Sequence, residues 1–421
     1  MKIWLINPYG PIPSEGWRHY RFTMIGEALA REGHIVTWWT ANFSHHFKCF
    51  RSAGWQDVPV CDGFRVRLVP TTPYRTNIGT GRLRFEANFV RNVRRGAHEC
   101  DAPDLLIAAD PPQSSGWLGA KLKAKFGVPL VLDVMDMWPE LFHLAFPAGL
   151  KFLAGPFLFP LYALRRRNLS CADGVTASCQ TFMELALREA PMLRTRPSAV
   201  VFNGIDVGDF SAAQITPITV SKPPGEVWAI YAGTLGVNYD VDTVLSAGLT
   251  LAGSSIQVLL VGDGPRRADV VHFIATHPSA NLRYKGKLSH KDLIQLYRLC
   301  DIGLCPYGPE STVALPDKAH DYMAAGLPMV NSLSGELAAL LRREDAGLPY
   351  EAGNPVSLAN ALLHLAGAES ERLRMARNSR RLAAEFDSNS QYPRFIRLVE
   401  TLISRGYNKA AACASTTPIV D

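Results

Sequence analysis

Residues 227–236 read Val-Trp-Ala-Ile-Tyr-Ala-Gly-Thr-Leu-Gly, an unbroken apolar run that ends in a glycine turn. A run without polar alternation is typical of a strand buried on both faces of a parallel sheet. Similar runs follow at 256–261, 302–305 and 328–331, and helical patterns lie near 240–252, 266–277, 290–299 and 316–325. The second half of the chain is therefore predicted to be a doubly wound α/β domain.

The first half shows the same alternation of apolar runs and helical patterns. Its apolar runs lie at 2–6, 35–40, 104–108, 129–134, 174–177 and 199–202. We therefore expect a second α/β domain with a parallel sheet, which makes the fold class α/β with two doubly wound units.

The boundary between the halves is marked by turn and linker residues. Asn203-Gly204-Ile205-Asp206 predicts a turn, and the Ser/Thr/Pro-rich stretch that follows, through Gly225, predicts a linker near 207–225. A last helical pattern carries apolar residues on one face from Tyr392 to Leu402. We expect domains at 1–207 and 208–386, a final helix at 387–406 and a disordered tail at 407–421.

Composition sets broad limits. The chain has 421 residues, 47% of them hydrophobic, which exceeds the size of one hydrophobic core. Its net charge of +6 suits an anionic ligand or a membrane surface and is too diffuse to indicate nucleic-acid binding. The first apolar run is too short for a signal peptide, so a cytoplasmic protein is expected. The eight cysteines include no C-x-x-C, which predicts reduced, mostly buried thiols without zinc.

Glycine loops follow several predicted strands, where open α/β sheets bind their ligands. The first loop carries Gly10 and Gly16 and leads into a helix, a pattern that favours an anion. It matches neither the P-loop nor the dinucleotide motif. Gly233-Thr234-Leu235-Gly236 and Val261-Gly262-Asp263-Gly264-Pro265 take equivalent places in the second half. Each is also typical of an ordinary turn, but together they predict a cleft.

The stretch Leu315-Pro316-Asp317-Lys318-Ala319-His320-Asp321-Tyr322-Met323-Ala324-Ala325-Gly326 is the most informative one. Pro316 suits a helix start and Gly326 its end, so Lys318 lies in the first turn, where the helix dipole disfavours a cation. An anionic ligand would resolve this conflict. Lys318 and Asp321 share a face, so an ammonium can meet a diphosphate while a carboxylate accepts ribose hydroxyls. The alternative is that Lys318 pairs with Asp317 or Asp321 on a solvated surface.

Two further segments carry notable charges. Asp133 and Asp136 end an apolar strand before Trp138-Pro139, and we expect both acids to face a cleft rather than the core. The alternative is that Asp136 caps a helix. The apolar segment 141–164 runs into Arg165-Arg166-Arg167 and is interrupted by prolines, which argues against a membrane-spanning helix. It fits either a core helix or a surface that dips into an anionic leaflet.

Taken together, these segments resemble the family 4 glycosyltransferases, which are retaining enzymes of GT-B fold, and particularly their bacterial surface-polysaccharide branch. Besides the first loop, the motifs that carry the resemblance over residues 1–405 are Gly33-His34, Asp136-x-Trp138-Pro139, Asn203-Gly204-Ile205-Asp206, Tyr231-Ala232-Gly233-Thr234-Leu235-Gly236, Gly262-Asp263-Gly264-Pro265, Lys285-Gly286-Lys287 and Leu315-Pro316-x-Lys318-x-x-Asp321-Tyr322-Met323-Ala324-Ala325-Gly326.

The resemblance implies two Rossmann-like domains that face each other across a cleft. The second would bind a nucleotide diphosphate sugar, with the base near Gly286 and Lys287 and the ribose on Asp321. The diphosphate would lie between Lys318 and the glycine loops, and no metal or cofactor is expected. The first domain would supply the acceptor side for a saccharide or polyprenyl-diphosphate-linked acceptor in lipopolysaccharide or other polysaccharide synthesis. The last helix would return to the first domain.

The chain departs from the family pattern at several positions. Many members have two acids separated by seven residues, but the position that pairs with Asp321 is Val313, and Glu310 lies nearby. Thr234 and Tyr239 stand where members often carry Arg and Lys. Met135 replaces a frequent His. Lys318, Asp136 and Glu310 are therefore the candidate catalytic residues.

Two other functions fit the same sequence. One is a nucleotide-sugar 2-epimerase of GT-B fold, which would use a donor without an acceptor. The other is a non-catalytic nucleotide-sugar-binding subunit, which the missing acid, Arg and Lys favour.

Overall fold

The computed structural model describes the chain except for residues 16–19, 78, 147, 148, 150, 151, 153, 215–220, 237, 238 and 415–421. It contains two compact units. Unit 1 comprises Met1–Asn203 and Gln391–Asp421, and unit 2 comprises Gly204–Ser390. The first boundary falls four residues before the expected one.

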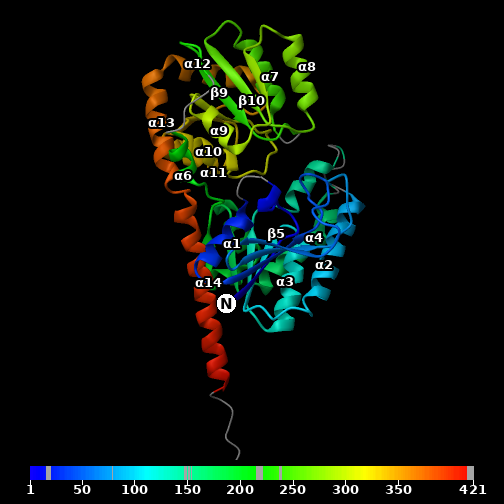
Figure 1. The fold of residues 1–421 in the computed structure, drawn as a ribbon. Helices are drawn as coiled ribbons and strands as arrows, with labels where there is room; N and C mark the ends of the chain where they lie inside the picture. Colours follow the sequence, from blue (N-terminus) through cyan, green and yellow to red (C-terminus); the bar gives the residue numbers. More distant parts are fainter. Residues whose placement is uncertain are drawn as a thin grey trace, which may run out of the picture. The chain divides into compact units, whose positions relative to one another are not determined.

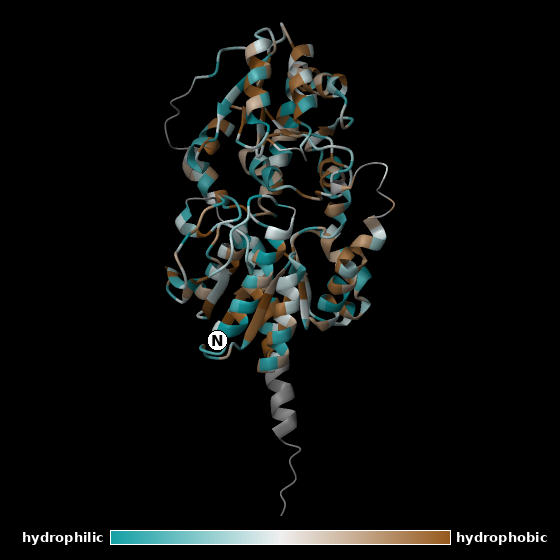
Figure 2. Cartoon of the chain, turned by 90° about the vertical axis from the view of Figure 1, so that its right-hand side faces the viewer, coloured by the Kyte–Doolittle hydropathy of each residue, from teal (hydrophilic) through white to brown (hydrophobic). Residues whose placement is uncertain are grey.

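Unit 1 is built on an eight-stranded sheet in the order β3-β4-β2-β1-β5-β6-β7-β8 (Figure 1). Its strands are β1 (Lys2–Ile6), β2 (Ile35–Ala41), β3 (Gln56–Cys61), β4 (Phe64–Val69), β5 (Leu105–Asp110), β6 (Leu130–Val134), β7 (Gly174–Ala177) and β8 (Ser198–Val200). Only the β3–β4 pair is antiparallel among these strands. Figure 2 shows strands of this unit, beside the N-terminus, in the colour of hydrophobic residues. The six predicted strands are confirmed.

The hairpin β3–β4 was not predicted, because its residues alternate in character. Exposed and partly buried residues alternate along β3, and β4 reads Phe-Arg-Val-Arg-Leu-Val with two arginines between apolar residues. Strands at the edge of a sheet have one hydrogen-bonding side unpaired and need fewer buried residues. The search for unbroken apolar runs therefore finds central strands and misses this edge.

The helices of unit 1 connect successive strands. They are α1 (Arg21–Arg31), α2 (Thr80–Gly96), α3 (Gln113–Phe126), α4 (Ala154–Cys171) and α5 (Gln180–Glu189), with short 3-10 turns η1 (Pro13–Glu15), η2 (Glu140–Ala145) and η4 (Pro191–Thr195). No helix in the described ranges is both long and apolar enough to cross a bilayer.

The final helix α14 (Ser388–Ala414) belongs to the core of unit 1. Its residues Tyr392, Phe395 and Val399 are buried in the same cluster as Ile3 and Leu5 of β1. The apolar face of this helix thus packs within the first unit. The expected tail at 407–421 is wrong as far as Ala414, because α14 continues that far; the remaining residues lie outside those described.

Asp133 does not face a cleft, contrary to expectation. Its side chain is fully buried in β6 and binds Arg21 of α1 through two hydrogen bonds of 2.7 Å. Thr176 Oγ1 also donates to Asp133 Oδ1 at 2.7 Å, and Arg21 Nη1 donates to the carbonyl of Val201. A buried carboxylate is tolerated when a cation and hydrogen bonds compensate it. Asp133 therefore ties α1 to the centre of the sheet and is not a site residue.

We expect Asp133→Leu to lower the free energy of unfolding by ~3–5 kcal/mol, because it leaves the Arg21 guanidinium buried without its partner. The double variant Arg21→Met/Asp133→Leu should recover part of this loss. Urea denaturation measures both. Equal unfolding midpoints for the parent and Asp133→Leu would contradict the assignment.

Unit 2 is built on a six-stranded parallel sheet in the order β11-β10-β9-β12-β13-β14. Its strands are β9 (Val227–Ala232), β10 (Ile256–Val261), β11 (Leu282–Gly286), β12 (Ile302–Cys305), β13 (Met329–Asn331) and β14 (Gly347–Pro349). β9, β10 and β12 have the predicted bounds. The edge strands β11 and β14 were not predicted, because one is only partly buried and the other has three residues.

The helices of unit 2 are α6 (Val207–Gln214), α7 (Val241–Thr250), α8 (Arg267–Thr276), α9 (His290–Tyr297), α10 (Asp317–Ala325), α11 (Glu336–Glu344), α12 (Pro355–Gly367) and α13 (Glu369–Ala383). The expected linker 207–225 is wrong at its start, which forms α6. α10 is fixed to the sheet by Tyr322, whose hydroxyl donates to Ile230 O at 3.0 Å and accepts from Ala232 N at 3.1 Å. This contact sets the place of α10 beside the end of β9.

Candidate functional site

Three loops of unit 2 join at the carboxyl ends of neighbouring strands. The loop after β9 bonds to the loop after β10 through Gly233 N to Val261 O and Leu235 N to Asp263 O, both 2.9 Å. The loop after β10 bonds in turn to the end of β11, from Gly262 N to Gly286 O at 2.9 Å. The predicted glycine loops therefore form one continuous edge.

The glycines at 262 and 264 are required by this contact between loops. A Cβ on Gly262 would lie 1.8 Å from the carbonyl oxygen of Gly233, and one on Gly264 would lie 2.4 Å from that of Leu235. Both also have a positive φ. From the sequence, these glycines were predicted to line a cleft, with ordinary turns as the alternative. The structure gives a direct reason for glycine, which is the close approach of the neighbouring backbone.

Lys318 lies in the first turn of α10 beside the Gly233 loop. Its side chain is buried, with a relative exposure of only 8%. An added Cβ on Gly233 would lie 3.0 Å from Lys318 Nζ. In the part of the chain that the structure describes, Nζ has no hydrogen-bond partner. The alternative of a solvated surface pair is therefore wrong, because Lys318 is buried.

Three tyrosine rings surround the Lys318 amine. Nζ lies 4.0 Å from the ring centre of Tyr231, 4.7 Å from that of Tyr239 and 5.3 Å from that of Tyr307. The Tyr231 hydroxyl donates to Thr234 O at 2.5 Å, which anchors this ring to the loop. We call these three residues the tyrosine cage. Cation–π attraction toward its rings partly replaces the hydration that burial removes from the ammonium.

Burial lowers the pKa of Lys318 to about 7, and the charges of Cys305 and Asp321 act in the opposite direction. The reason is that the charged form loses its hydration in a buried place. The amine is thus close to half protonated at neutral pH. An anion placed beside it would favour the ammonium.

Other predicted donor residues lie along the same edge. Asp321 is buried in α10, one turn after Lys318. Thr234 is exposed and Gly236 is buried in the loop after β9. Gly286 ends β11, and the exposed Lys287 follows it. Adjacent strands therefore bring these residues to one side of unit 2.

The remaining predicted site residues differ in their surroundings. Glu310 is exposed in the loop between β12 and α10. Gly10 belongs to unit 1, where an added Cβ would lie 2.3 Å from the ring of Tyr20, so its small size serves packing. Gly16 lies outside the described residues.

Asp136 follows β6 in unit 1 and is partly buried. Its Oδ1 accepts a hydrogen bond from Met137 N at 2.8 Å, and burial raises its pKa. The turn η2 that follows has Pro139 as its N-cap and no side-chain cap, so the capping alternative for Asp136 is wrong. A second acid, Asp110, ends the neighbouring strand β5 and was not singled out in the sequence. Burial raises the pKa of Asp110 to about 7.

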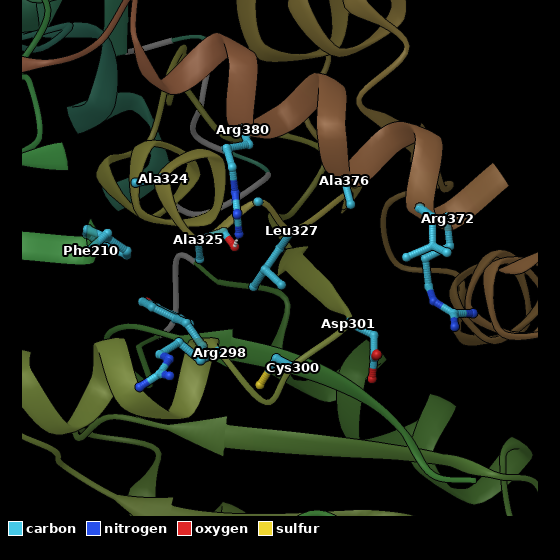
Figure 3. A pocket seen from close by; sticks show the side chains of 13 residues that line it. Phe210, Arg298, Cys300, Asp301, Ala324, Ala325, Leu327, Arg372, Ala376 and Arg380 are labelled. Carbon is cyan, nitrogen blue, oxygen red and sulfur yellow. Dashed lines mark hydrogen bonds between the residues drawn. The ribbon is translucent and has the colours of Figure 1, made fainter. Parts of the chain in front are cut away.

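A cavity of about 290 Å³ opens at the opposite edge of unit 2 (Figure 3). It lies at the amino ends of β12 and β13, since Asp301 and Leu327 line it. Arg372 and Arg380 also line it and donate to the carbonyls of Leu365 and Ala325, at 2.6 and 3.1 Å. These two hydrogen bonds satisfy carbonyl groups at the carboxyl ends of α12 and α10. None of the predicted donor residues lines this cavity.

Metal and thiol chemistry have little support in the described ranges. No group of three or more His, Cys, Asp or Glu side chains is placed there to hold a metal ion. The seven described cysteines are free thiols. Cys179, Cys300 and Cys305 are buried, whereas Cys49 and Cys61 are exposed, so the expectation of mostly buried thiols is wrong for unit 1.

Comparison with known families assigns both halves of the chain. Residues 19–204 match the model of a glycosyl transferase 4-like domain, and residues 227–367 match that of glycosyl transferases group 1. The chain belongs to these glycosyltransferase families. No curated protein sequence matches this glycosyltransferase.

Solved structures share the GT-B fold over nearly the whole length. Sucrose-phosphate synthase from Thermosynechococcus elongatus is 18% identical, with a TM-score of 0.71, 96% of this chain and 99% of that chain covered. Anabaena HepE in complex with UDP is 15% identical, with a TM-score of 0.65 and coverages of 95% and 100%. WaaG, a glycosyltransferase involved in lipopolysaccharide biosynthesis, is 15% identical, with a TM-score of 0.58 and coverages of 93% and 98%. At these identities the likeness establishes the fold.

Gly262→Ala tests the contact between the glycine loops. We expect it to lower the free energy of unfolding by roughly 1–3 kcal/mol, because its methyl group overlaps the Gly233 carbonyl. Gly286→Ala is the control, since it shares a positive φ but has open space around the Cβ position. Thermal unfolding should show the larger loss for Gly262→Ala. An equal loss in both variants would show that the contact is not tight.

Proposed function

We propose that the protein is a retaining glycosyltransferase that transfers a sugar from a nucleotide diphosphate donor to a saccharide or lipid-linked acceptor in surface polysaccharide synthesis. The observation that carries the donor assignment is the buried Lys318 amine without a hydrogen-bond partner in the described part of the chain, beside the Gly233 loop. A buried polar group of this kind is costly unless a ligand satisfies it.

The donor would bind along the carboxyl edge of the second sheet. The diphosphate would meet the Lys318 amine and the loop from Gly233 to Gly236, while Asp321 would accept the ribose hydroxyls. The base would lie toward Gly286 and Lys287, at the end of β11. This order follows the sheet, in which β11, β10, β9 and β12 are neighbours. The HepE structure with UDP-glucose, of the same fold, supports a nucleotide sugar as the donor class.

The proposed chemistry is displacement with retention, in which the bond to the sugar breaks ahead of attack. The departing diphosphate gains negative charge, and the Lys318 ammonium stabilises it as fixed cations do in other sites. We propose no metal for this step. The departing phosphate would take the proton of the acceptor hydroxyl, and Asp136 and Glu310 remain the candidate catalytic acids.

We expect Lys318→Met to reduce turnover of a nucleotide sugar by roughly 10²-fold or more, since removal of one fixed donor to a developing anion has effects of this size. Thermal shift with UDP, ADP and GDP and their sugars, without added metal, identifies the donor first. Lys121→Met is the matched control, because Lys121 is exposed on α3 of unit 1, outside the proposed donor site. Turnover by Lys318→Met equal to that of the parent would exclude the role.

The same assays separate the alternatives. Release of free sugar without an acceptor would favour a nucleotide-sugar 2-epimerase. Tight donor binding without turnover would favour a non-catalytic binding subunit. Retention itself is checked by the anomeric configuration of the product in NMR spectra.

We further propose that unit 1 docks on the inner face of the cytoplasmic membrane through the beginning of α4. Phe157 and Phe159 are 74% and 63% exposed there, and Phe152, just before the helix, is 73% exposed. Exposed aromatic side chains with nearby cations are typical of a surface that dips into an anionic leaflet. The exposed Arg166 and Arg167 lie on the same helix.

Of the three consecutive arginines, Arg165 has a different role from the other two. The side chain of Arg165 is buried and binds Glu140 at 2.7 and 2.8 Å and Glu189 at 3.1 Å. Arg165 therefore cannot contact lipid. Arg166 is exposed but also pairs with Glu189 at 2.7 Å. The proposed docking surface therefore consists of the exposed phenylalanines together with Arg166 and Arg167.

Phe157→Ser/Phe159→Ser should abolish most flotation with liposomes that contain anionic lipid, because it removes exposed apolar surface without disturbing a core. Leu373→Ser, an exposed leucine in unit 2, is the control and should float like the parent. Absent flotation of the parent, or equal flotation of both variants, would count against docking through α4.

A further inference from the structure

In the described structure, the Lys318 amine is buried beside the three rings of the tyrosine cage. Nζ is closed to solvent, although the proposed function needs it to meet a diphosphate. Tyr231 is the second-last residue of β9, Tyr307 follows β12, and Tyr239 lies between β9 and α7. Tyr239 and Tyr307 also form an isolated bridge between their backbones, and their rings are 5.3 Å apart. The cage is therefore held together by neighbouring strands.

The groups that face the amine make a nearly neutral surrounding. Besides the three rings, Cys305 approaches from β12 and Asp321 from α10 itself. Burial raises the pKa of the Cys305 thiol to about 12 and raises the pKa values of Tyr231, Tyr307 and Tyr322 well above their usual range. Thiol and phenol groups thus stay protonated near neutral pH. Among these groups, only Asp321 offers the amine a carboxyl.

We propose that Tyr231, Tyr239 and Tyr307 are positioning residues that hold the Lys318 amine out of water until a diphosphate binds and draws it out as an ammonium. The inference rests on the proposed donor site. The step moves one proton from solvent or buffer to Nζ of the neutral amine, and no other bond forms or breaks. The phosphate charge favours the charged amine, whereas burial among rings favours the neutral one.

Because the buried amine must gain a proton when a diphosphate binds, diphosphate binding should depend on pH. Because burial lowers the pKa of Lys318 to about 7, binding should take up a fraction of a proton near neutral pH and a larger fraction at higher pH. Affinity should fall as pH rises above 7, approaching a tenfold loss per pH unit. A lysine already exposed as an ammonium would show neither effect in this range.

The first test uses the protein without ligand. The folded pKa of Lys318 lies below its unfolded value, so the folded state holds fewer protons between pH 7 and about 10, and stability rises with pH across this window. Lys318→Met lacks this dependence. We expect the melting temperature of Lys318→Met to exceed that of the parent at pH 7 and the difference to shrink by pH 9.5. A constant difference would overturn the inference, whatever the protein binds.

The second test measures proton uptake by titration calorimetry with UDP and with inorganic pyrophosphate, in buffers of different ionisation enthalpy at pH 8. Tyr239→Phe should keep the uptake because the ring remains, and Tyr239→Leu should reduce it by half or more. Lys318→Arg, always charged, should bind without uptake. Binding by the parent without proton uptake would contradict the positioning role of the tyrosine cage but not the proposed donor site. Absence of any binding would count against the proposed function, while the ligand-free test still decides the cage.

Discussion

The rest of the proposed site depends on a buried amine next to a backbone loop. Lys318 starts a helix, where the dipole already disfavours a cation, and burial adds a second penalty. The structure tolerates this cost through three aromatic rings, without a hydrogen bond from any described residue. A group kept at such cost in a fold of known transferases points to a ligand of opposite charge.

The edge that surrounds this amine is shaped by contacts between loops. Gly262 and Gly264 allow the backbone after β10 to lie directly against the loop after β9. Tyr322 fixes α10 to the ends of β9 and β12. The loops and Asp321 are thus positioned by the sheet itself, beside the place where the diphosphate would bind. Rigid support of this kind favours electrostatic stabilisation of a departing group.

The sequence predicted the central strands of both units well, because a short, unbroken apolar run between turn residues is typical of a strand buried on both faces. The edge strands β3, β11 and β14 and the inner strand β4 were missed, since half-buried or short strands lack that pattern. Lys318 was found through the conflict between a cation and the helix dipole, which is visible in the sequence. The burial of Lys318 and the tyrosine cage were not predicted, because Tyr231, Tyr239 and Tyr307 come together only in the folded chain.

The wrong predictions have a common cause, which is a partner distant in sequence. Asp133 was expected in a cleft, but Arg21, 112 residues earlier, neutralises it in the core. Arg165 was one of three arginines that fitted either a core helix or a lipid-facing surface, but Glu140 and Glu189 pair with its buried side chain. Tyr239 was the one visible signal for the cage, as it stands where related transferases often carry a lysine.

The most direct test of the central claim is a crystal structure of the protein with a bound nucleoside diphosphate. The account predicts that the diphosphate lies at the carboxyl edge of unit 2, with an oxygen within hydrogen-bond distance of Lys318 Nζ and the amine outside the tyrosine cage. A diphosphate bound elsewhere, or bound at this edge with Lys318 still enclosed by the three rings, would contradict it.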